Sequence, residues 1–219
     1  MKNLTHAEFE ILTKNALVLT DDEYGKKVLQ LTDNSIVKLF RVKRLISQAN
    51  LYSPARRFAH NARRLQRLQV PTIELIALYR IKSIQRTAVH YKQLAGITLR
   101  EYLQSRPAED EFLSRLGAFL AHMHALGIFF RSAHFGNIIV TVDKQFGLID
   151  ISDMTISRFP LGYFKRIRNM KHFFRLKEDI ELVQQSQLIE HSYLQHCRIN
   201  NRIFKRHFLQ TCQKLKAAF

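Results

Sequence analysis

The residues best suited to chemistry lie in residues 127–140 and in residues 147–150, which follow after a short turn. A polar loop, residues 131–137, separates two apolar runs and ends at Asn137. The next apolar run closes with Asp150, thirteen residues after Asn137. Amide and carboxylate oxygens are the ligands that hard cations prefer. Asn137 and Asp150 each carry an oxygen of this kind.

The order of these features resembles the catalytic segment of protein-kinase-like enzymes, in which a long helix, a strand, a polar loop and two strands precede an acidic residue. The resemblance implies that Asn137 and Asp150 hold Mg²⁺ on the phosphates of ATP. It also assigns Lys38, in an apolar strand-like run, to the lysine that pairs with those phosphates. Tyr91 and Gln93 then belong to the hinge segment whose backbone meets adenine.

The loop itself departs from the kinase pattern at its catalytic position. The kinase triplet His-Arg-Asp reads Phe130-Arg131-Ser132 here, so Ser132 stands where the catalytic base would be. Ser132 could hydrogen-bond a substrate hydroxyl, but a hydroxyl is a poor proton acceptor at neutral pH. His134, two residues further on, has an ordinary pKa suited to a substitute base. Its alternative role is to brace the loop.

Three further positions differ from the kinase pattern. Asn61 occupies the helix position of the glutamate that would pair with Lys38, and its amide could still accept a hydrogen bond. The triplet Asp-Phe-Gly reads Asp150-Ile151-Ser152. Between the first strands only Gly25 is available for a glycine-rich loop.

These departures leave two kinase-fold hypotheses open. Positioning and charge neutralisation supply most of the catalysis in phosphoryl transfer, and a general base contributes typically ~10²–10⁴-fold. Loss of the base therefore slows the reaction without abolishing it. The chain is either an active phosphotransferase or a pseudokinase that acts as a scaffold or regulator of envelope biogenesis.

More closely, the chain resembles the bacterial lipopolysaccharide core kinases, the Kdo and heptose kinases, including relatives known as toluene-tolerance proteins. The resemblance extends from about Val18 to Asp179. It rests on the Lys38 strand, residues 57–65, the hinge, the catalytic segment and residues 168–179. It implies ATP and Mg²⁺ as cofactors and transfer of phosphate to a sugar hydroxyl of the lipopolysaccharide core, at the cytoplasmic face of the inner membrane.

The elements that must position these residues are expected to form an α+β, two-lobed protein-kinase-like fold. Residues 1–92 form a small antiparallel β lobe, with one helix after Ser53-Pro54 besides a short one at 8–16 and with strands at 16–19, 27–31, 35–40, 73–78 and 87–91. Residues 93–219 form a mostly helical lobe with helices at 99–103, 111–125 and from 165 onward. The catalytic-loop-like segment is 128–153.

Composition limits the class of protein. The 219 residues are 46% hydrophobic, which is enough for a core, and no apolar run approaches the ~18 residues of a membrane span. The first residues lack the layout of a secretory signal, and two cysteines are too few for a disulfide scaffold. We therefore expect a cytoplasmic protein, either free in the cytoplasm or bound peripherally to the inner membrane.

The charge indicates a polyanionic partner. The chain has 35 Lys and Arg against 18 Asp and Glu, and from Met154 onward thirteen basic residues face four acidic ones. A second basic group, residues 41–67, includes Lys43 and Arg44.

We expect basic residues around Arg166, Arg168, Lys171 and Arg175 to bind phosphates of the lipopolysaccharide core, another anionic glycolipid or inner-leaflet lipid. Nucleic acid is the weakest candidate partner, because the chain lacks Trp and shows no zinc-finger or helix-turn-helix signature.

Overall fold

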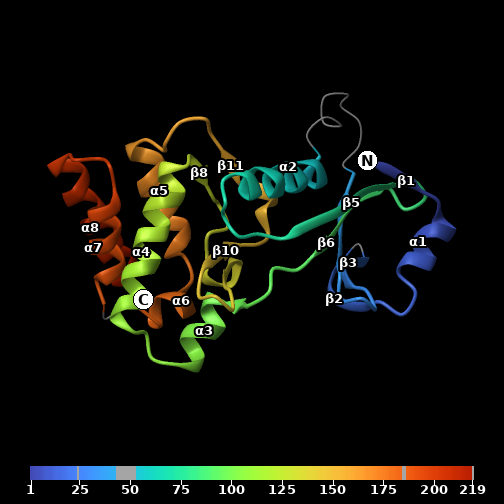
Figure 1. Ribbon diagram of the computed structural model, residues 1–219, viewed down its shortest axis with the longest axis horizontal. Coiled ribbons are helices and arrows are strands. Elements are labelled where there is room, and N and C mark those ends of the chain that lie inside the picture. Colours follow the sequence, from blue (N-terminus) through green and yellow to red (C-terminus); the bar gives the residue numbers. More distant parts are fainter. Residues whose placement is uncertain (24, 43–52, 184–185, 219) are drawn as a thin grey trace. The chain divides into compact units, whose positions relative to one another are not determined.

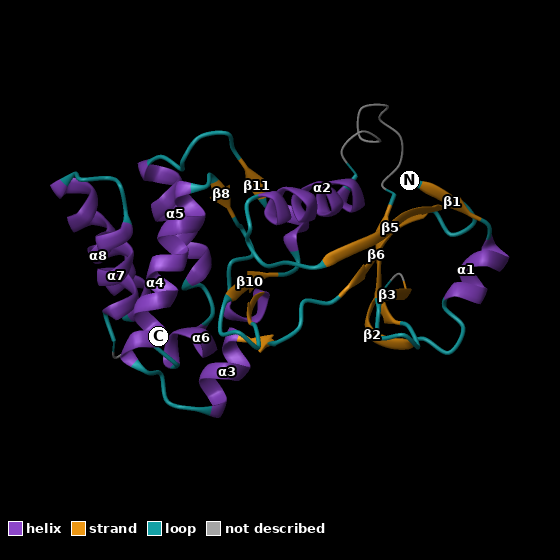
Figure 2. Cartoon of the chain, in the orientation of Figure 1, coloured by secondary structure: helices purple, strands orange, loops and turns teal. Residues whose placement is uncertain are grey.

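The structure, a computed structural model, describes residues 1–23, 25–42, 53–183 and 186–218. Lys43, Arg44 and Phe219, which the sequence placed in a basic group and in the last helical region, lie outside these residues. The chain is mixed α and β and divides into two compact units, Met1–Leu94 and Ala95–Phe219. The first unit contains the large sheet and two helices, whereas helices predominate over short strands in the second (Figure 1, Figure 2).

The first unit is built on a six-stranded sheet with the order β1-β5-β6-β4-β3-β2. The strands are β1 Lys2–Leu4, β2 Leu17–Asp22, β3 Gly25–Gln30, β4 Ile36–Arg41, β5 Glu74–Ile81 and β6 Arg86–Lys92. Neighbouring strands are antiparallel, except that β1 runs parallel to β5. All five predicted strands are present. The sequence did not predict β1, because its three residues carry no alternation of buried and exposed side chains.

Helix α1, His6–Leu12, packs on one face of this sheet through Phe9, which joins an apolar cluster that includes residues of β3 and β4. A capping box starts the helix: the Thr5 side chain accepts from Glu8 N at 3.2 Å, and the Glu8 carboxylate accepts from Thr5 N at 2.7 Å. The sequence predicted a helix at 8–16. It begins earlier because of this box, and it ends at Leu12 because the chain turns at residues 13–15 to enter β2.

Helix α2, Pro54–Arg67, packs on the opposite face of the sheet. Phe58 of α2 contacts Phe40 of β4 and Tyr91 of β6, with ring centroids 6.3 Å and 5.3 Å apart. Side chains alternate between the faces of a strand, so Phe40 lies on the face away from the neighbouring Leu39, which belongs to the Phe9 cluster. The predicted helix after Ser53-Pro54 is confirmed.

The second unit is mainly helical. Its helices are α3 Leu99–Ser105, α4 Asp110–Ala125, α5 Tyr163–Phe173, α6 Lys177–Glu181, α7 Leu188–His196 and α8 Arg202–Lys216. The long helix α4 packs closely on α7, because a Cβ at Gly117 would come within 2.2 Å of the Ile189 carbonyl oxygen. Within the described ranges, no helix combines the length and apolar content that a bilayer span requires.

Short strands of the second unit surround the polar loop. The strands β7 Ile97–Thr98, β9 Ile138–Val140 and β10 Phe146–Leu148 form an antiparallel sheet in the order β10-β9-β7. Strand β8, Ile128–Phe129, precedes the loop and pairs antiparallel with β11, Thr155–Ile156, which follows β10. Two single turns of 3₁₀ helix, η1 Phe135–Asn137 and η2 Ile151–Asp153, connect these strands. The loop is therefore held at both ends by backbone pairing.

Candidate functional site

The hairpin of β9 and β10 brings Asn137 and Asp150 to one end of a strand pair. Ile138 stands opposite Leu148 in the register, and Ile149 N donates to the Asn137 carbonyl oxygen at 3.1 Å. Asp150 is the next residue. The candidate cation ligands, thirteen residues apart in sequence, are thus neighbours in the fold.

Asp150 has a backbone conformation that few residues other than glycine adopt. Its φ of 48° and ψ of 49° are left-handed, a region that asparagine and aspartate tolerate better than other side chains. The residue turns the chain out of β10 and into the 3₁₀ turn η2. This turn carries Asp153 to the polar loop.

Asp153 meets Ser132, the residue at the catalytic position. The Ser132 hydroxyl donates to Asp153 Oδ2 at 2.7 Å. The other carboxylate oxygen, Oδ1, is buried and has no hydrogen-bond partner in the described structure. A carboxylate therefore stands beside position 132, although the sequence has none at that position. The sequence interpretation missed Asp153, and its only signal was an acidic residue three positions after Asp150.

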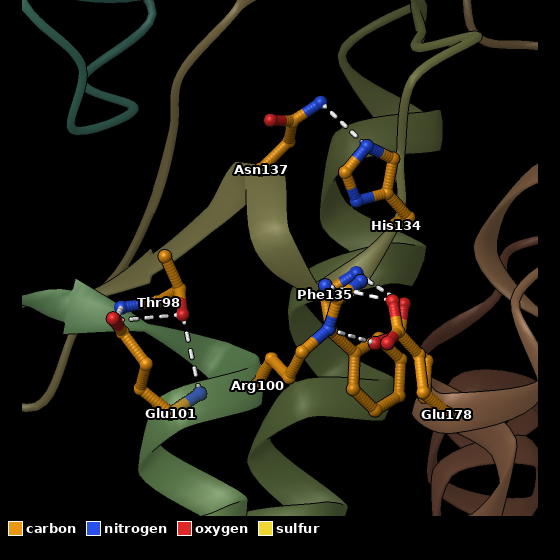
Figure 3. Close-up of polar contacts among 8 residues, drawn as sticks. Thr98, Arg100, Glu101, His134, Phe135, Asn137 and Glu178 are labelled. Carbon is orange, nitrogen blue, oxygen red and sulfur yellow. Dashed lines mark hydrogen bonds and ion pairs between the residues drawn. The ribbon is translucent and has the colours of Figure 1, made fainter. Parts of the chain in front are cut away.

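Asn137 is oriented by hydrogen bonds within the loop. Its side-chain Nδ2 donates to the Ser132 carbonyl oxygen and to His134 Nε2, both at 3.0 Å. The amide oxygen points away from the imidazole ring (Figure 3). This orientation suits Asn137 to offer its oxygen, the atom that a hard cation binds.

His134 braces the loop in this arrangement. Its Nε2 accepts from Asn137, so its Nδ1 carries the proton, and Nδ1 is buried without a hydrogen-bond partner in the described residues. Burial lowers the pKa of His134, Arg175 lowers it further, and Asp179 opposes the shift. The ring is therefore neutral at pH 7, and its one lone pair is already used. The geometry favours the bracing role over that of a substitute base.

A buried carboxylate on α6 accepts a hydrogen bond from the backbone in the middle of the loop. Asp179 of α6 is fully buried and accepts from Phe135 N at 2.9 Å and from Arg100 Nε at 2.7 Å. Arg100 also pairs with Glu178 at 2.8 Å (Figure 3). A second capping box fixes the start of α3, since Thr98 and Glu101 exchange hydrogen bonds there. The loop is thus tied to α3 and α6.

A buried polar chain holds the beginning of the loop. Asn169 of α5 accepts from Phe130 N at 3.2 Å and donates to Phe130 O at 2.6 Å. His124 Nε2 donates to the same Asn169 oxygen at 3.1 Å, and the Tyr193 hydroxyl donates to His124 Nδ1 at 2.8 Å. Arg166 Nη1 completes the chain by donating to the Tyr193 oxygen at 3.0 Å. Burial lowers the pKa of His124 to about 3, so the ring is neutral here.

This chain corrects one expectation from the sequence. Arg166 was expected to bind anionic groups, but it is only 2% exposed, and its Nε donates to the Leu161 carbonyl oxygen at 2.7 Å. Its charge is used inside the second unit. The other three basic residues of that group, Arg168, Lys171 and Arg175, are exposed.

Positive charge gathers beside the loop. Burial lowers the pKa of His172, and Arg168, Arg131 and Arg175 lower it further, whereas Asp153 opposes the shift. These three guanidinium groups are exposed. Arg131, which the kinase pattern placed among the catalytic residues, therefore belongs with Arg168 and Arg175 to a group of charges that acts on His172, and we call these three arginines the basic rim. Such a rim suits an anionic substrate.

The remaining predicted site residues belong to the first unit. Lys38, in the centre of β4, is largely buried, and its Nζ lies 5.8 Å from the ring centroid of Phe58 on α2. Asn61, also buried, is one helical turn beyond Phe58. Tyr91 packs against the same Phe58 ring. Lys38, Asn61 and Tyr91 thus meet where α2 covers the sheet, while Gln93 is exposed beyond the end of β6.

No protein-family model matches the chain, and no curated protein matches it. In the part of the chain that the structure describes, no group of three or more His, Cys, Asp or Glu is placed to hold a metal ion. Cys197 and Cys212 are both free thiols.

Proposed function

We propose that the chain is an ATP- and Mg²⁺-dependent phosphotransferase with a two-lobed, kinase-like fold, related to the bacterial lipopolysaccharide core kinases. Two arrangements support the proposal. The first unit places Lys38 beneath a helix that carries Asn61, and the second places Asn137 and Asp150 together at the end of a hairpin. Each matches the order of residues in the kinase pattern.

The observation that carries the proposal is the hydrogen bond between Ser132 and Asp153. The pseudokinase hypothesis rested on two weakened parts: the missing carboxylate at position 132, and Asn61 in place of the glutamate that would pair with Lys38. Asp153 supplies a carboxylate 2.7 Å from the Ser132 hydroxyl, from a different segment of the chain. The acid–base part of the reaction therefore has a candidate proton acceptor.

The residues divide the work as follows. Lys38 would bind the phosphates of ATP, and Asn137 and Asp150 would hold Mg²⁺, which neutralises charge on those phosphates when bound. The acceptor oxygen forms a bond to the γ-phosphorus while the bond from that phosphorus to the β–γ bridging oxygen breaks, and ADP leaves. The proton of the acceptor hydroxyl passes to Ser132 Oγ, and the proton of Ser132 passes to Asp153. Asn137 and His134 hold the loop in position for this transfer.

The basic rim favours an anionic acceptor. Arg131, Arg168 and Arg175 lie near one another around His172 and are exposed. A phosphorylated sugar of the lipopolysaccharide core, or another anionic glycolipid, has the negative charge that such a rim would bind. Its place of synthesis, the cytoplasmic face of the inner membrane, is the location that we propose for the protein.

The direct test is transfer of labelled phosphate. Purified protein, Mg²⁺ and γ-labelled ATP are incubated with lipopolysaccharide core oligosaccharide, and label on the sugar is measured. We expect transfer by the wild type and none by Asp150→Ala. Asp143→Ala, in the exposed turn between β9 and β10, is the matched control and should retain activity.

One result would contradict this function. Absence of label on the oligosaccharide under every condition would exclude the core kinase activity. If MgATP still bound in that case, the pseudokinase hypothesis would replace it, and Ser132→Asp should then leave the cellular role of the protein unchanged.

A further inference from the structure

A surface of the second unit exposes large apolar side chains that the proposed reaction does not use. Phe159 is 72% exposed, Phe164 is 82% exposed and Ile203 is 74% exposed. We call these three residues the apolar tip. The two phenylalanines are the only exposed ones in the described residues. Exposed apolar groups that cluster commonly mark an interaction site.

Contacts through Tyr163 bring two residues of the tip, Phe164 and Ile203, to one place. The Tyr163 ring lies 5.0 Å from the Phe164 ring and 5.2 Å from that of Phe204, the neighbour of Ile203 on α8. The Tyr163 hydroxyl and His207 Nδ1, one turn after Ile203, are 2.6 Å apart. The first turn of α5 is thus fastened to the first turns of α8.

The loop before α5 belongs to the same surface. It carries Phe159, follows β11 and leads into Tyr163. Together with the start of α5 it lines a hollow of about 330 Å³, formed by Ser157, Pro160, Leu161, Gly162, Tyr163, Phe164 and Lys165. The apolar tip therefore stands beside a recess in the surface.

The segments that form the tip carry basic residues and no acidic ones. Neither residues 154–177 nor residues 191–218 contain an Asp or a Glu. Arg158, Lys165, Arg202 and Arg206 adjoin members of the tip in sequence or by one helical turn, and all four are exposed. Their charges are therefore available to an external anion.

We propose that the apolar tip and these four basic side chains dock the protein on an anionic lipid bilayer. Phenylalanine and isoleucine side chains enter the boundary between headgroups and acyl chains, and Lys and Arg beside them pair with anionic headgroups. Neither attraction alone gives firm attachment, but the two together do. Lipid fits better than nucleic acid, because Ile203 and Pro160 offer no ring on which a base could stack.

The docking surface is independent of the phosphotransferase proposal. It uses none of the residues around Ser132, Asn137 and Asp150, so a protein without kinase activity would still dock, and failure to dock would leave the transfer assay unaffected. The chain reaches Phe159 six residues after Asp153. A docked protein would therefore present its loop close to the membrane surface.

Vesicle binding tests the proposal at the apolar side chains. The full-length protein is sedimented at physiological salt with vesicles of phosphatidylcholine containing phosphatidylglycerol, and with phosphatidylcholine alone. We expect binding to the anionic vesicles only, and at least about tenfold weaker binding for the double variant Phe159→Ser and Phe164→Ser. Val142→Ser, a change at a residue 83% exposed in the turn between β9 and β10, is the control and should bind as the wild type does.

Fluorescence tests the position of the tip directly. The chain has no Trp, so Phe164→Trp and Val142→Trp each create a single probe. With anionic vesicles, the emission of Phe164→Trp should shift to the blue and be quenched by brominated lipid, whereas that of Val142→Trp should not change. The proposal is overturned if neither probe responds or if the double serine variant binds vesicles as the wild type does. It is also overturned if the double serine variant alters only self-association or RNA binding and leaves vesicle binding unchanged.

Discussion

Ser132 and Asp153 come from segments 21 residues apart, and their hydrogen bond joins the polar loop to the turn after β10. His134, the nearer titratable residue in sequence, already uses its lone pair on Asn137. At the scale of single residues, the proton acceptor of the proposed reaction is therefore Asp153. His134 is a positioning residue, because it acts through the amide of Asn137.

Asp153→Asn tests this assignment. The substitution keeps the size of the side chain and removes its ability to take a proton, so phosphate transfer should fall ~10²–10⁴-fold while the affinity for MgATP stays unchanged. Rates come from the labelled-phosphate assay and affinity from calorimetry. Asp143→Asn, on the exposed hairpin turn, is the matched control. An equal loss of nucleotide affinity would show that Asp153 is a metal ligand or a structural residue instead.

The sequence predicted some of the residues of the candidate site and missed others. Asn137 and Asp150 were assigned from the resemblance to the kinase pattern and its spacing, and the hairpin of β9 and β10 places the two residues at one end of the strand pair. Asp153 could not be found in that way, since its contact depends on the left-handed turn at Asp150. The burial of Arg166 was equally hidden, because its partners lie in residues far along the chain, such as Tyr193.

At the scale of elements, helices α3, α4, α5 and α6 hold the loop through buried polar contacts. Asp179 of α6 binds the backbone of the loop and the Arg100 side chain of α3. Asn169 of α5 binds the backbone at Phe130, and His124 of α4 orients Asn169. Asp179, Asn169 and His124 are themselves buried, so a lost partner leaves a buried polar group without compensation.

Asp179→Ala should destabilise the protein strongly. The change removes a fully buried carboxylate and leaves Arg100 Nε and Phe135 N without their acceptor. Loss of one partner from a buried pair typically lowers the free energy of unfolding by about 3–5 kcal/mol. Urea unfolding measures the change.

The matched control for that change is Glu178→Ala. Glu178 pairs with the same arginine, but its side chain is 56% exposed, so the expected loss is at most about 1 kcal/mol. If the two variants were equally stable, the loop would not depend on the buried carboxylate. Asp179→Asn, which keeps an acceptor oxygen, should fall between them if Asp179→Ala does not fold.

His124 should make the stability of the protein depend on pH. Burial holds its folded-state pKa near 3, below the ordinary value of 6.5. As pH falls below 6.5, His124 becomes protonated in the unfolded chain but stays neutral in the folded chain, so the free energy of unfolding decreases. Between pH 6.5 and 5 this decrease is about 2 kcal/mol from His124 alone. Above pH 7 the residue should have no effect.

The variant His124→Gln separates this contribution from those of other groups. Glutamine can donate to Asn169 and accept from Tyr193, but it does not titrate. Urea unfolding at pH 7 and pH 5 should therefore show a smaller decrease in the variant than in the wild type. His6→Gln, at an exposed residue near the N-terminus, should retain the full decrease. An identical decrease in all three proteins would disprove the assignment.

The elements themselves were predictable where the pattern was long. The long helix was predicted at 111–125 and spans Asp110–Ala125, since its apolar face repeats over several turns. The strands β1, β7 and β11 have two or three residues each, too few to show any period. They exist because a neighbouring strand offers hydrogen bonds, and that information is absent from local sequence.

At the scale of the whole molecule, the charge of +17 has several uses. Lys38 is buried in the first unit, and Arg166 serves the interior of the second. The exposed remainder includes a basic rim beside the loop and the four residues of the docking surface. We therefore propose that the positive charge has separate roles in separate places, and the expectation of a polyanionic partner stays a prediction.

The whole-molecule prediction concerns MgATP, because its proposed ligands belong to different units. Lys38 is part of Met1–Leu94, whereas Asp150 is part of Ala95–Phe219. If Lys38 and Asp150 are both MgATP ligands, Lys38→Ala and Asp150→Ala should each abolish the heat of MgATP binding in calorimetry. Lys27→Ala, at an exposed lysine of β3, should leave that heat unchanged. Removing Mg²⁺ should weaken binding in the wild type and change little in Asp150→Ala, since that variant has already lost a proposed metal ligand. Binding that survives either substitution would show that the substituted residue is not a ligand of MgATP and would contradict its proposed role.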